Sequence, residues 1–251
     1  MTTLSASSVK TWEDCHLMWY FTYVEMRPEP PNEPRETGII VHDYAEWALK
    51  TASARFVEEL PAGERVSVDA DVAALFNLFR DEVLPTYGEP VLVEAAFELD
   101  VEGITYTGFI DSVDKQDDPL GAMWGAQGYR VVLRNLKTTG SRPRKGKFRD
   151  NMTGYHLGAR ELGHEPDRWL LDYLVRTKTP YYWPEEQDVP DDDEIDIWAA
   201  KVVDTHAQIE EGDWEATGVG TYVCNYCPFK AICGPYERYQ DITSPIRTDA
   251  R

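Results

Sequence analysis

The residues of this 251-residue chain that could do metal chemistry lie in two strand-like segments. The segment "VVLRNLKTTG" carries Asn135 and Lys137, which project from the same face of a strand because they are two residues apart. The segment "GFIDSVD" carries Asp111, which lies close to Asn135 if the two strands are neighbours. Carboxylates at both 111 and 135 would hold one or two divalent ions through oxygen ligands, which Mg2+ prefers.

Such an ion would lower the pKa of a bound water and neutralise charge that grows on a phosphodiester, while Lys137 would orient the water or meet the same charge. Asn135 departs from this pattern, because its amide oxygen can contact a metal but brings no charge. Three explanations stay open. The first, which we favour, is that Asn135 is an engineered replacement of an aspartate. The second is that the protein is a natural inactive relative. The third is that the register differs and another acidic residue is the metal ligand.

The surroundings of Asp111 also need an explanation. On a regular strand Asp111 shares one side with Phe109 and Val113, which is an apolar side. An unpaired charge in such a place is expensive. We therefore expect Asp111 to have a partner, which is either a metal ion or a buried Arg or Lys.

Four cysteines form a second candidate site. Cys224, Cys227 and Cys233 have the spacing C-x2-C-x5-C, and Cys15 stands alone near the start of the chain. In an intracellular chain this spacing indicates a metal or cluster site rather than a disulfide framework. Four thiolates suit a tetrahedral zinc or an iron–sulfur cluster. The arrangement of one cysteine plus three favours a 4Fe-4S cluster, which would hold the two ends of the chain together.

Apolar periodicity and turn residues predict the elements that position these residues. In chain order they are a helix over 4–24, a Pro-rich loop over 26–37, helices over 38–60 and 72–84, strands over 90–101, 104–116 and 129–139, a helix over 150–163, a strand over 168–177 and a helix over 194–212. The three consecutive strands predict an antiparallel meander, and the mixture predicts an α/β fold.

The charge of the chain limits its partners. With 45 acidic and 25 basic residues and a net charge of −20, it does not coat nucleic acid with its whole surface, although a local basic groove remains compatible. The acidic block over 184–198 is expected to be a solvated loop that leads into a helix. Basic residues follow directly on the "VVLRNLKTTG" segment, where their position favours DNA contact. They are Arg142, Arg144, Lys145, Lys147 and Arg149.

No apolar run approaches the roughly 18 residues that a membrane span requires, and the N-terminal residues lack the apolar stretch of a secretory signal. We therefore expect a cytoplasmic protein.

Six motifs, "LSASSVKTWEDC", "GIIVH", "GFIDSVD", "NLKTTG", "NMTGY" and "CNYCPFKAIC", have the order and spacing of the RecB-like branch of the PD-(D/E)xK nuclease superfamily. Over nearly its whole length the chain resembles CRISPR-associated and phage-encoded exonucleases with an iron–sulfur cluster, and the nuclease domains of AddAB-type helicase-nucleases. The resemblance implies one restriction-endonuclease-like domain over 1–251, with a mixed central sheet flanked by helices. Its parts would be a helical region over 1–88, an αβββαβ core over 89–212 and a cluster segment over 213–251.

The resemblance also implies roles for individual residues. His42 and Asp111 match metal ligands, Asn135 stands where Asp or Glu is usual, and the carbonyl of Leu136 would be a further ligand. Lys137 matches the catalytic lysine. For Glu94, a solvated or salt-bridged role is the stronger expectation, although it could contribute from the first strand.

Tyr155 matches the Tyr of a Q-x-x-x-Y helix that lies along the DNA, and Asn151 stands where the Gln would be. The cluster ligands would be Cys15, Cys224, Cys227 and Cys233. The resemblance therefore implies a DNA exonuclease that uses Mg2+ or Mn2+ with a structural 4Fe-4S cluster, impaired here by Asn135, in a bacterial, archaeal or phage-infected cell. The alternative is a non-catalytic module that binds DNA ends or a recombination, helicase or CRISPR-adaptation protein.

Overall fold

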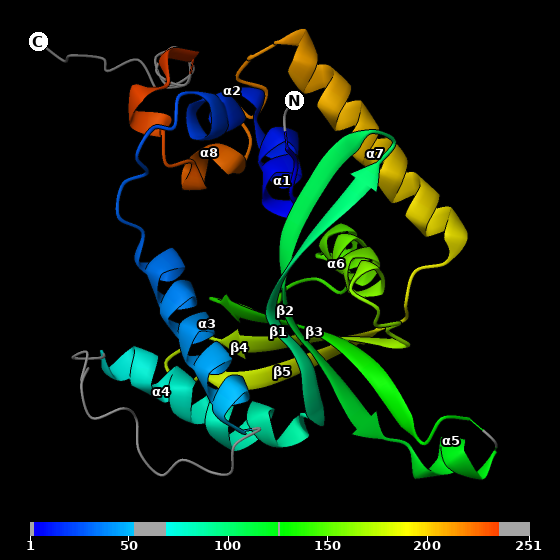
Figure 1. Ribbon diagram of the computed structural model, residues 1–251. Helices are drawn as coiled ribbons and strands as arrows, with labels where there is room; N and C mark the ends of the chain where they lie inside the picture. The colour runs from blue at the N-terminus through cyan, green and yellow to red at the C-terminus, as the bar shows by residue number, and fades with distance from the viewer. Residues whose placement is uncertain (1–2, 53–68, 125, 236–251) are drawn as a thin grey trace, which may run out of the picture.

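A five-stranded mixed sheet forms the centre of the molecule in the computed structural model, which describes residues 3–52, 69–124 and 126–235 (Figure 1). The strands follow the order of the sequence across the sheet, and β3 and β4 are parallel whereas the other neighbours are antiparallel. They are β1 Glu89–Val101, β2 Ile104–Asp117, β3 Tyr129–Thr139, β4 Arg168–Val175 and β5 Tyr181–Gln187. The expected mixed sheet and its antiparallel β1–β2–β3 meander are confirmed.

Helices cover both faces of this sheet (Figure 1). One face packs against α3 and α4, and the other packs against α6, with α1 and α7 beyond it. The α-helices in the described residues are α1 Ala6–Asp14, α2 His16–Trp19, α3 Glu33–Ala52, α4 Ala70–Leu78, α5 Pro119–Met123, α6 Arg149–Glu161, α7 Asp192–Glu211 and α8 Val223–Tyr226. Short π-helical turns extend α2 and α4 over Tyr20–Val24 and Phe79–Val83. Each face of the sheet buries its own apolar cluster.

Local capping explains where α7 begins and ends. The side chain of Asp191 accepts a hydrogen bond from the backbone N–H of Glu194, and the Glu194 side chain accepts one from the N–H of Asp191. At the other end Gly212 adopts a left-handed conformation with φ 75°, which glycine tolerates without steric cost. The helix predicted over 194–212 is confirmed.

Two boundaries differ from the sequence-based expectation, and a third lies outside the described residues. The helix predicted over 4–24 is interrupted at Cys15, whose extended backbone (φ −170°, ψ 121°) separates α1 from α2. The Pro-rich loop ends at Asn32, because Pro34 lies in the first turn of α3, where a missing N–H costs little. The part of the predicted 38–60 helix beyond Ala52 lies outside the described residues, as do residues 236–251 of the cluster segment.

The acidic block also contains a strand that the sequence analysis missed. Residues 184–187 belong to β5, so the prediction of a solvated loop is wrong for them. Glu185 and Gln187 are buried whereas Pro184 and Glu186 are exposed, which is the alternation of a strand with polar residues on its inner side. Because β5 is an edge strand, Pro184 does not interrupt the sheet.

None of the helices in the described ranges is long and apolar enough to span a membrane.

Candidate metal centre

The candidate metal centre lies at an irregularity in the hairpin formed by β1 and β2. Val93 pairs with Ser112, and Ala95 pairs with Ile110. Glu94 and Asp111 lie opposite each other between these pairs but do not form a regular pair themselves. Glu94 has a backbone φ of 47°, a conformation that is unfavourable for a non-glycine residue and persists only where its surroundings impose it. The strained backbone therefore marks the position of the two carboxylates.

This irregularity changes the direction of the side chains along β2. The sequence places Phe109 and Val113 together on an apolar side with Asp111, but Phe109 is 62% exposed and Val113 is fully buried. Val113 packs in the same core cluster as Ile110. Regular alternation is therefore lost between Asp111 and Val113, and the prediction that Val113 shares a side with Asp111 is wrong.

Asp111 is held in place by the backbone of β3. The ladder between β2 and β3 ends at the pair Ser112–Arg134, so the strands separate at the next residue. There the Oδ2 atom of Asp111 accepts a hydrogen bond of 2.8 Å from the backbone N–H of Leu136. The carboxylate thus has a fixed direction and keeps its remaining lone pairs available.

His42 on α3 completes a group of three possible metal ligands. Its Nδ1 atom lies 3.9 Å from Oε1 of Glu94 and 3.7 Å from Oδ2 of Asp111. One ligand atom from each residue lies within 4.8 Å of the other two. Ligands around an octahedral ion at about 2.1 Å are separated by about 3.0 Å when adjacent and about 4.2 Å when opposite. The three side chains therefore fit a single divalent ion.

The charge state of His42 reflects its neighbours. Burial lowers the pKa of His42, but the interaction with Glu94 and the negative charge of Asp111 outweigh burial and the positive charge of Lys137, so the pKa is raised. A proton and a metal ion therefore compete for the imidazole, and metal affinity should fall as the pH falls.

Lys137 lies at the same site. It lines an open cavity of about 410 Å³ together with His42 and Glu94. At this cavity α3 lies close to β3, since a Cβ atom at Gly38 would lie 3.2 Å from the hydroxyl oxygen of Thr138. The other lining residues are Arg35, Gly38, Ile39, Asp43, Glu46 and Thr138. The predicted grouping of His42, Asp111 and Lys137 is thus found in space.

Asn135 lies beside this group but is almost fully buried. It is 1% exposed, and neither its amide oxygen nor its amide nitrogen has a hydrogen-bond partner among the described residues. Unpartnered polar atoms in a protein interior are uncommon and indicate strain or a missing ligand such as an ion or a water. The amide oxygen of Asn135 is therefore free to accept such a ligand.

Two of the predicted DNA-contact residues on α6, Tyr155 and Asn151, have different surroundings. Tyr155 lies near the centre, and its pKa is raised by burial and then by the negative charges of Asp111 and Glu94. Asn151 instead lines a cavity of about 110 Å³ between α1, α6 and α7. Lys201 lines the same cavity. The structure thus brings Tyr155 to the carboxylates, while Asn151 lies along the same helix toward α7.

The basic run after β3 is partly engaged within the protein. Arg149 donates hydrogen bonds of 2.9 and 2.6 Å to the carboxylate of Glu194 on α7. Arg142 lies 3.4 Å above the ring of Trp183. Arg144 and Lys145 are exposed, and the side chain of Lys147 lies over Phe148 at 5.2 Å. Arg144 and Lys145 are the members of the run best placed to meet an external partner.

The four cysteines lie in one region formed by both ends of the described chain. Cys15 and Cys233 are buried, and Cys224 and Cys227 are half-buried. The pKa of Cys227 is raised by burial, to which the nearby thiols of Cys15, Cys233 and Cys224 add. A Cβ atom at Gly218 would lie 2.7 Å from the carbonyl oxygen of Asp14, so the segment before Cys224 packs directly against the break that carries Cys15. The predicted proximity of the four cysteines is found.

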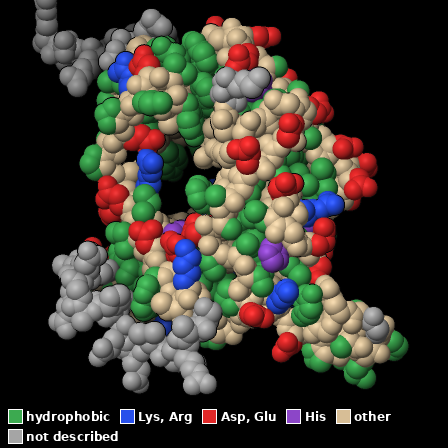
Figure 2. Space-filling view, in the orientation of Figure 1, with side chains coloured by type: hydrophobic (Ala, Val, Ile, Leu, Met, Phe, Trp, Pro, Cys, Tyr) green, Lys and Arg blue, Asp and Glu red, His purple; other side chains and the backbone are tan. Residues whose placement is uncertain are grey.

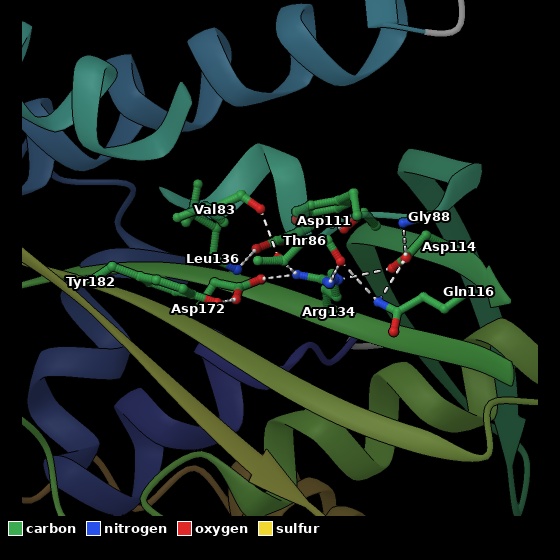
Figure 3. Close-up of polar contacts among 12 residues, drawn as sticks. Val83, Thr86, Gly88, Asp111, Asp114, Gln116, Arg134, Leu136, Asp172 and Tyr182 are labelled. Carbon is green, nitrogen blue, oxygen red and sulfur yellow. Dashed lines mark hydrogen bonds and ion pairs between the residues drawn. The ribbon is translucent and has the colours of Figure 1, made fainter. Parts of the chain in front are cut away.

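A buried ion cluster lies beside the centre, between the sheet and the segment that follows α4 (Figure 3). Arg134 is 1% exposed and donates hydrogen bonds of 2.9 Å to Asp114 and 3.1 Å to Asp172, both of which are fully buried. It also donates a 2.6 Å bond to the carbonyl oxygen of Thr86. The cluster joins β2, β3, β4 and the loop before β1, immediately beside Asp111. The buried Arg of the sequence-based alternative thus exists, but its carboxylate partners are Asp114 and Asp172.

Glu94 has the salt-bridged role expected from the sequence, since its carboxylate lies 3.9 Å from His42, and it is also one of the three possible metal ligands. The sequence contains a signal for its position opposite Asp111. The two-residue turn Glu102–Gly103 joins Val101 to Ile104, and counting outward from this pair in an antiparallel hairpin places Glu94 opposite Asp111. No comparable local signal exists for the cluster around Arg134, because its members come from separate strands.

Comparisons with known proteins agree with this arrangement. The sequence profile of the PD-(D/E)XK nuclease superfamily matches residues 3–234. A crystal structure of a protein from Eubacterium rectale, described as a "Putative exonuclease", is similar with a TM-score of 0.56 and 12% identity, covering 97% of this chain and 94% of that one. At this identity the likeness shows the fold alone. No curated protein matches the chain at a significant level. Because the profile match covers most of the sequence, the chain belongs to the PD-(D/E)XK nuclease superfamily.

Proposed function

We propose that the protein is a metal-dependent DNA exonuclease that hydrolyses phosphodiester bonds at the ends of single-stranded or duplex DNA. The observation that carries the proposal is the convergence of His42, Glu94 and Asp111 beside Lys137. Membership of a nuclease superfamily supports hydrolysis of phosphodiesters. The description of the similar crystal structure supports attack from an end, as does the resemblance of the sequence motifs to exonucleases.

Each side chain has a distinct task in this proposal. A divalent ion, when bound, supplies a water of lowered pKa and positive charge beside the phosphate. Asp111 keeps its ligand direction because the N–H of Leu136 holds it. Lys137 donates to the attacking water or to the phosphate oxygen that gains charge. The water oxygen bonds to phosphorus and releases a proton to solvent as the ester bond breaks, and the leaving oxygen takes up a proton from solvent.

The ligand set suggests which ions serve. Mg2+ prefers oxygen ligands, whereas Mn2+ accepts imidazole nitrogen more readily. Because His42 supplies nitrogen, we expect Mn2+ to bind more tightly than Mg2+. The backbone carbonyl of Leu136 would add a further oxygen.

In this proposal the side chain at position 135 determines how fast the protein hydrolyses DNA. It lacks the negative charge that an aspartate would bring, so hydrolysis should be impaired. Glu94 supplies a carboxylate at the same site. We therefore infer that metal binding survives while hydrolysis is slow.

A second candidate is a non-catalytic module that binds DNA ends or a recombination, helicase or CRISPR-adaptation partner. The observation that favours it is the uncharged side chain at Asn135. In either case Tyr155 and the exposed Arg144 and Lys145 would contact DNA, with Asn151, Arg142, Lys147 and Arg149 in supporting positions. We place both candidates in the cytoplasm of a bacterial, archaeal or phage-infected cell.

We further propose that the four cysteines hold a structural 4Fe-4S cluster that closes a single nuclease domain. The support for this proposal is that the one-plus-three cysteines of the sequence, which come from both ends of the described chain, lie in one region. Iron and acid-labile sulfide in anaerobically purified protein would support the cluster, and stoichiometric zinc would contradict it.

Calorimetric titration with Mn2+ distinguishes the metal-dependent nuclease from the non-catalytic binding module, because only the nuclease requires the metal ion. The Asp111→Asn variant should bind Mn2+ at least about 10-fold more weakly, because it loses an anionic ligand. The matched control is Asp43→Asn, which removes the same charge from the same cavity but from outside the group of three ligands. If the starting protein binds no Mn2+, or if both variants bind it equally well, the metal-centre proposal fails and the binding module is favoured.

A further inference from the structure

The side chain of Phe109 is exposed beside the metal centre. It is 62% exposed, although phenylalanine is among the residues that folded proteins most often bury. It is a member of neither of the two core clusters. A single exposed aromatic ring is not unusual by itself, so the position of this one decides its meaning.

Phe109 precedes Asp111 by two residues on β2, which corresponds to about 6.6 Å along a strand. Gly108 and Ile110, on either side of it, face the core beneath α6. Alternation therefore directs Phe109 away from α6, toward the side on which α3 provides His42. Its partner across the hairpin is Ala96, which is itself exposed and too small to cover the ring.

The space around this part of the hairpin is open. Figure 2 shows that the molecule is hollowed between the β1–β2 hairpin and the segment that leads into α3. On α3, Ile39 is 52% exposed and lines the same cavity as His42. A strand of nucleic acid whose phosphate lies at the carboxylates would therefore have room for its base beside Phe109.

We propose that Phe109 is a stacking platform for an unpaired base next to the scissile phosphate, and that it makes single-stranded ends the preferred substrate. This inference rests on the proposed nuclease function. The separation of Phe109 from Asp111 is comparable to that between a phosphate and the base of the same nucleotide. Aromatic rings stack on every base, so the contact gives affinity without sequence preference. An internal base of a duplex already has both faces covered and cannot use the platform.

Binding of a fluorescein-labelled oligo(dT) in Ca2+, chosen as an oxygen-binding ion in place of Mn2+, tests the platform. Phe109→Ala should raise the Kd about 10-fold, and Phe109→Trp should restore it, because stacking needs only an aromatic face. The matched control is Trp124→Ala, which removes an 88% exposed ring at the tip of the β2–β3 connection and should leave the Kd unchanged. Thermal melts confirm that each variant is folded.

A single abasic residue moved along the oligonucleotide sharpens the test. In the starting protein one abasic position should raise the Kd about 10-fold, and in Phe109→Ala the same position should raise it no further, since the platform is already absent. An unchanged Kd in Phe109→Ala, or an abasic penalty that persists there, overturns the platform and leaves the nuclease proposal standing. Absence of Mn2+ binding by the starting protein overturns the function on which the platform rests.

Discussion

Replacing Arg134 by methionine tests the buried ion cluster that supports the metal centre. The guanidinium is the cation that the structure pairs with both Asp114 and Asp172, and all three side chains are at most 1% exposed. Removing one partner of a buried pair costs about 3–5 kcal/mol, because it leaves a buried charge uncompensated. Asp172 limits this loss, since burial already raises its pKa and it can take up a proton. We therefore expect Arg134→Met to lower the free energy of unfolding by about 4 kcal/mol at pH 7.

Urea denaturation and thermal melting measure this change. A loss of that size in a chain of this length corresponds to a melting temperature lower by roughly 10 °C. Without the guanidinium, the pKa of Asp172 should rise further in the folded state, and a raised folded pKa means that stability is lost as the pH rises. The deficit should therefore shrink between pH 7 and pH 5.

The control is Arg168→Met, which breaks a pair with Glu186 in which the side chains are 33% and 57% exposed. Exposed pairs contribute about 0–1 kcal/mol, so this variant should remain close to the starting protein. An Arg134→Met protein that is destabilised no more than the Arg168→Met protein, or whose deficit is independent of pH, would refute the role of the cluster.

Two further predictions concern buried groups near the sheet. The pKa of His156 is lowered to about 4 by burial and by Arg160, so the unfolded chain binds this proton more tightly than the folded one. Stability should fall by about 3 kcal/mol between pH 6.5 and pH 4, and His156→Gln should remove that part of the slope in urea titrations; a slope that survives contradicts the assignment. At Gly88 a Cβ atom would lie 1.9 Å from the backbone oxygen of Lys115, so Gly88→Ala should cost about 3 kcal/mol or more. Gly140→Ala, which meets no atom within 4 Å, is the control, and equal melting temperatures for the two variants would contradict the packing.

Sequence reasoning succeeded where local signals determine the structure. The helix α7 has an acidic N-cap and a terminal glycine, β1 to β3 have alternating residues, and a two-residue turn joins β1 to β2. It failed at β5, because Glu185 and Gln187 are polar residues that face inward. There the carboxylate of Glu185 accepts a hydrogen bond from the backbone of Gly146, a contact between distant segments that the sequence does not reveal.

The candidate site was also only partly accessible from sequence. Asp111, Lys137 and His42 were identified through motifs, and Glu94 could have been identified from the hairpin register. The loss of alternation after Asp111 could not have been identified, since it accompanies the irregular pairing of β1 and β2 at Glu94. The ion pairs of Arg134 could not have been identified either, because its two carboxylate partners lie 20 and 38 residues away along the chain.

The central claim is that a metal ion held at His42, Glu94 and Asp111 hydrolyses DNA ends and that Asn135 weakens this reaction. The most direct measurement is Mn2+-dependent degradation of end-labelled DNA by the Asn135→Asp protein, with and without Asp111→Asn. The account predicts that Asn135→Asp degrades DNA at least about 100-fold faster than the starting protein and that adding Asp111→Asn abolishes the gain. An Asn135→Asp protein that stays as inert as the starting protein, or one that keeps its activity without the Asp111 carboxylate, would contradict it.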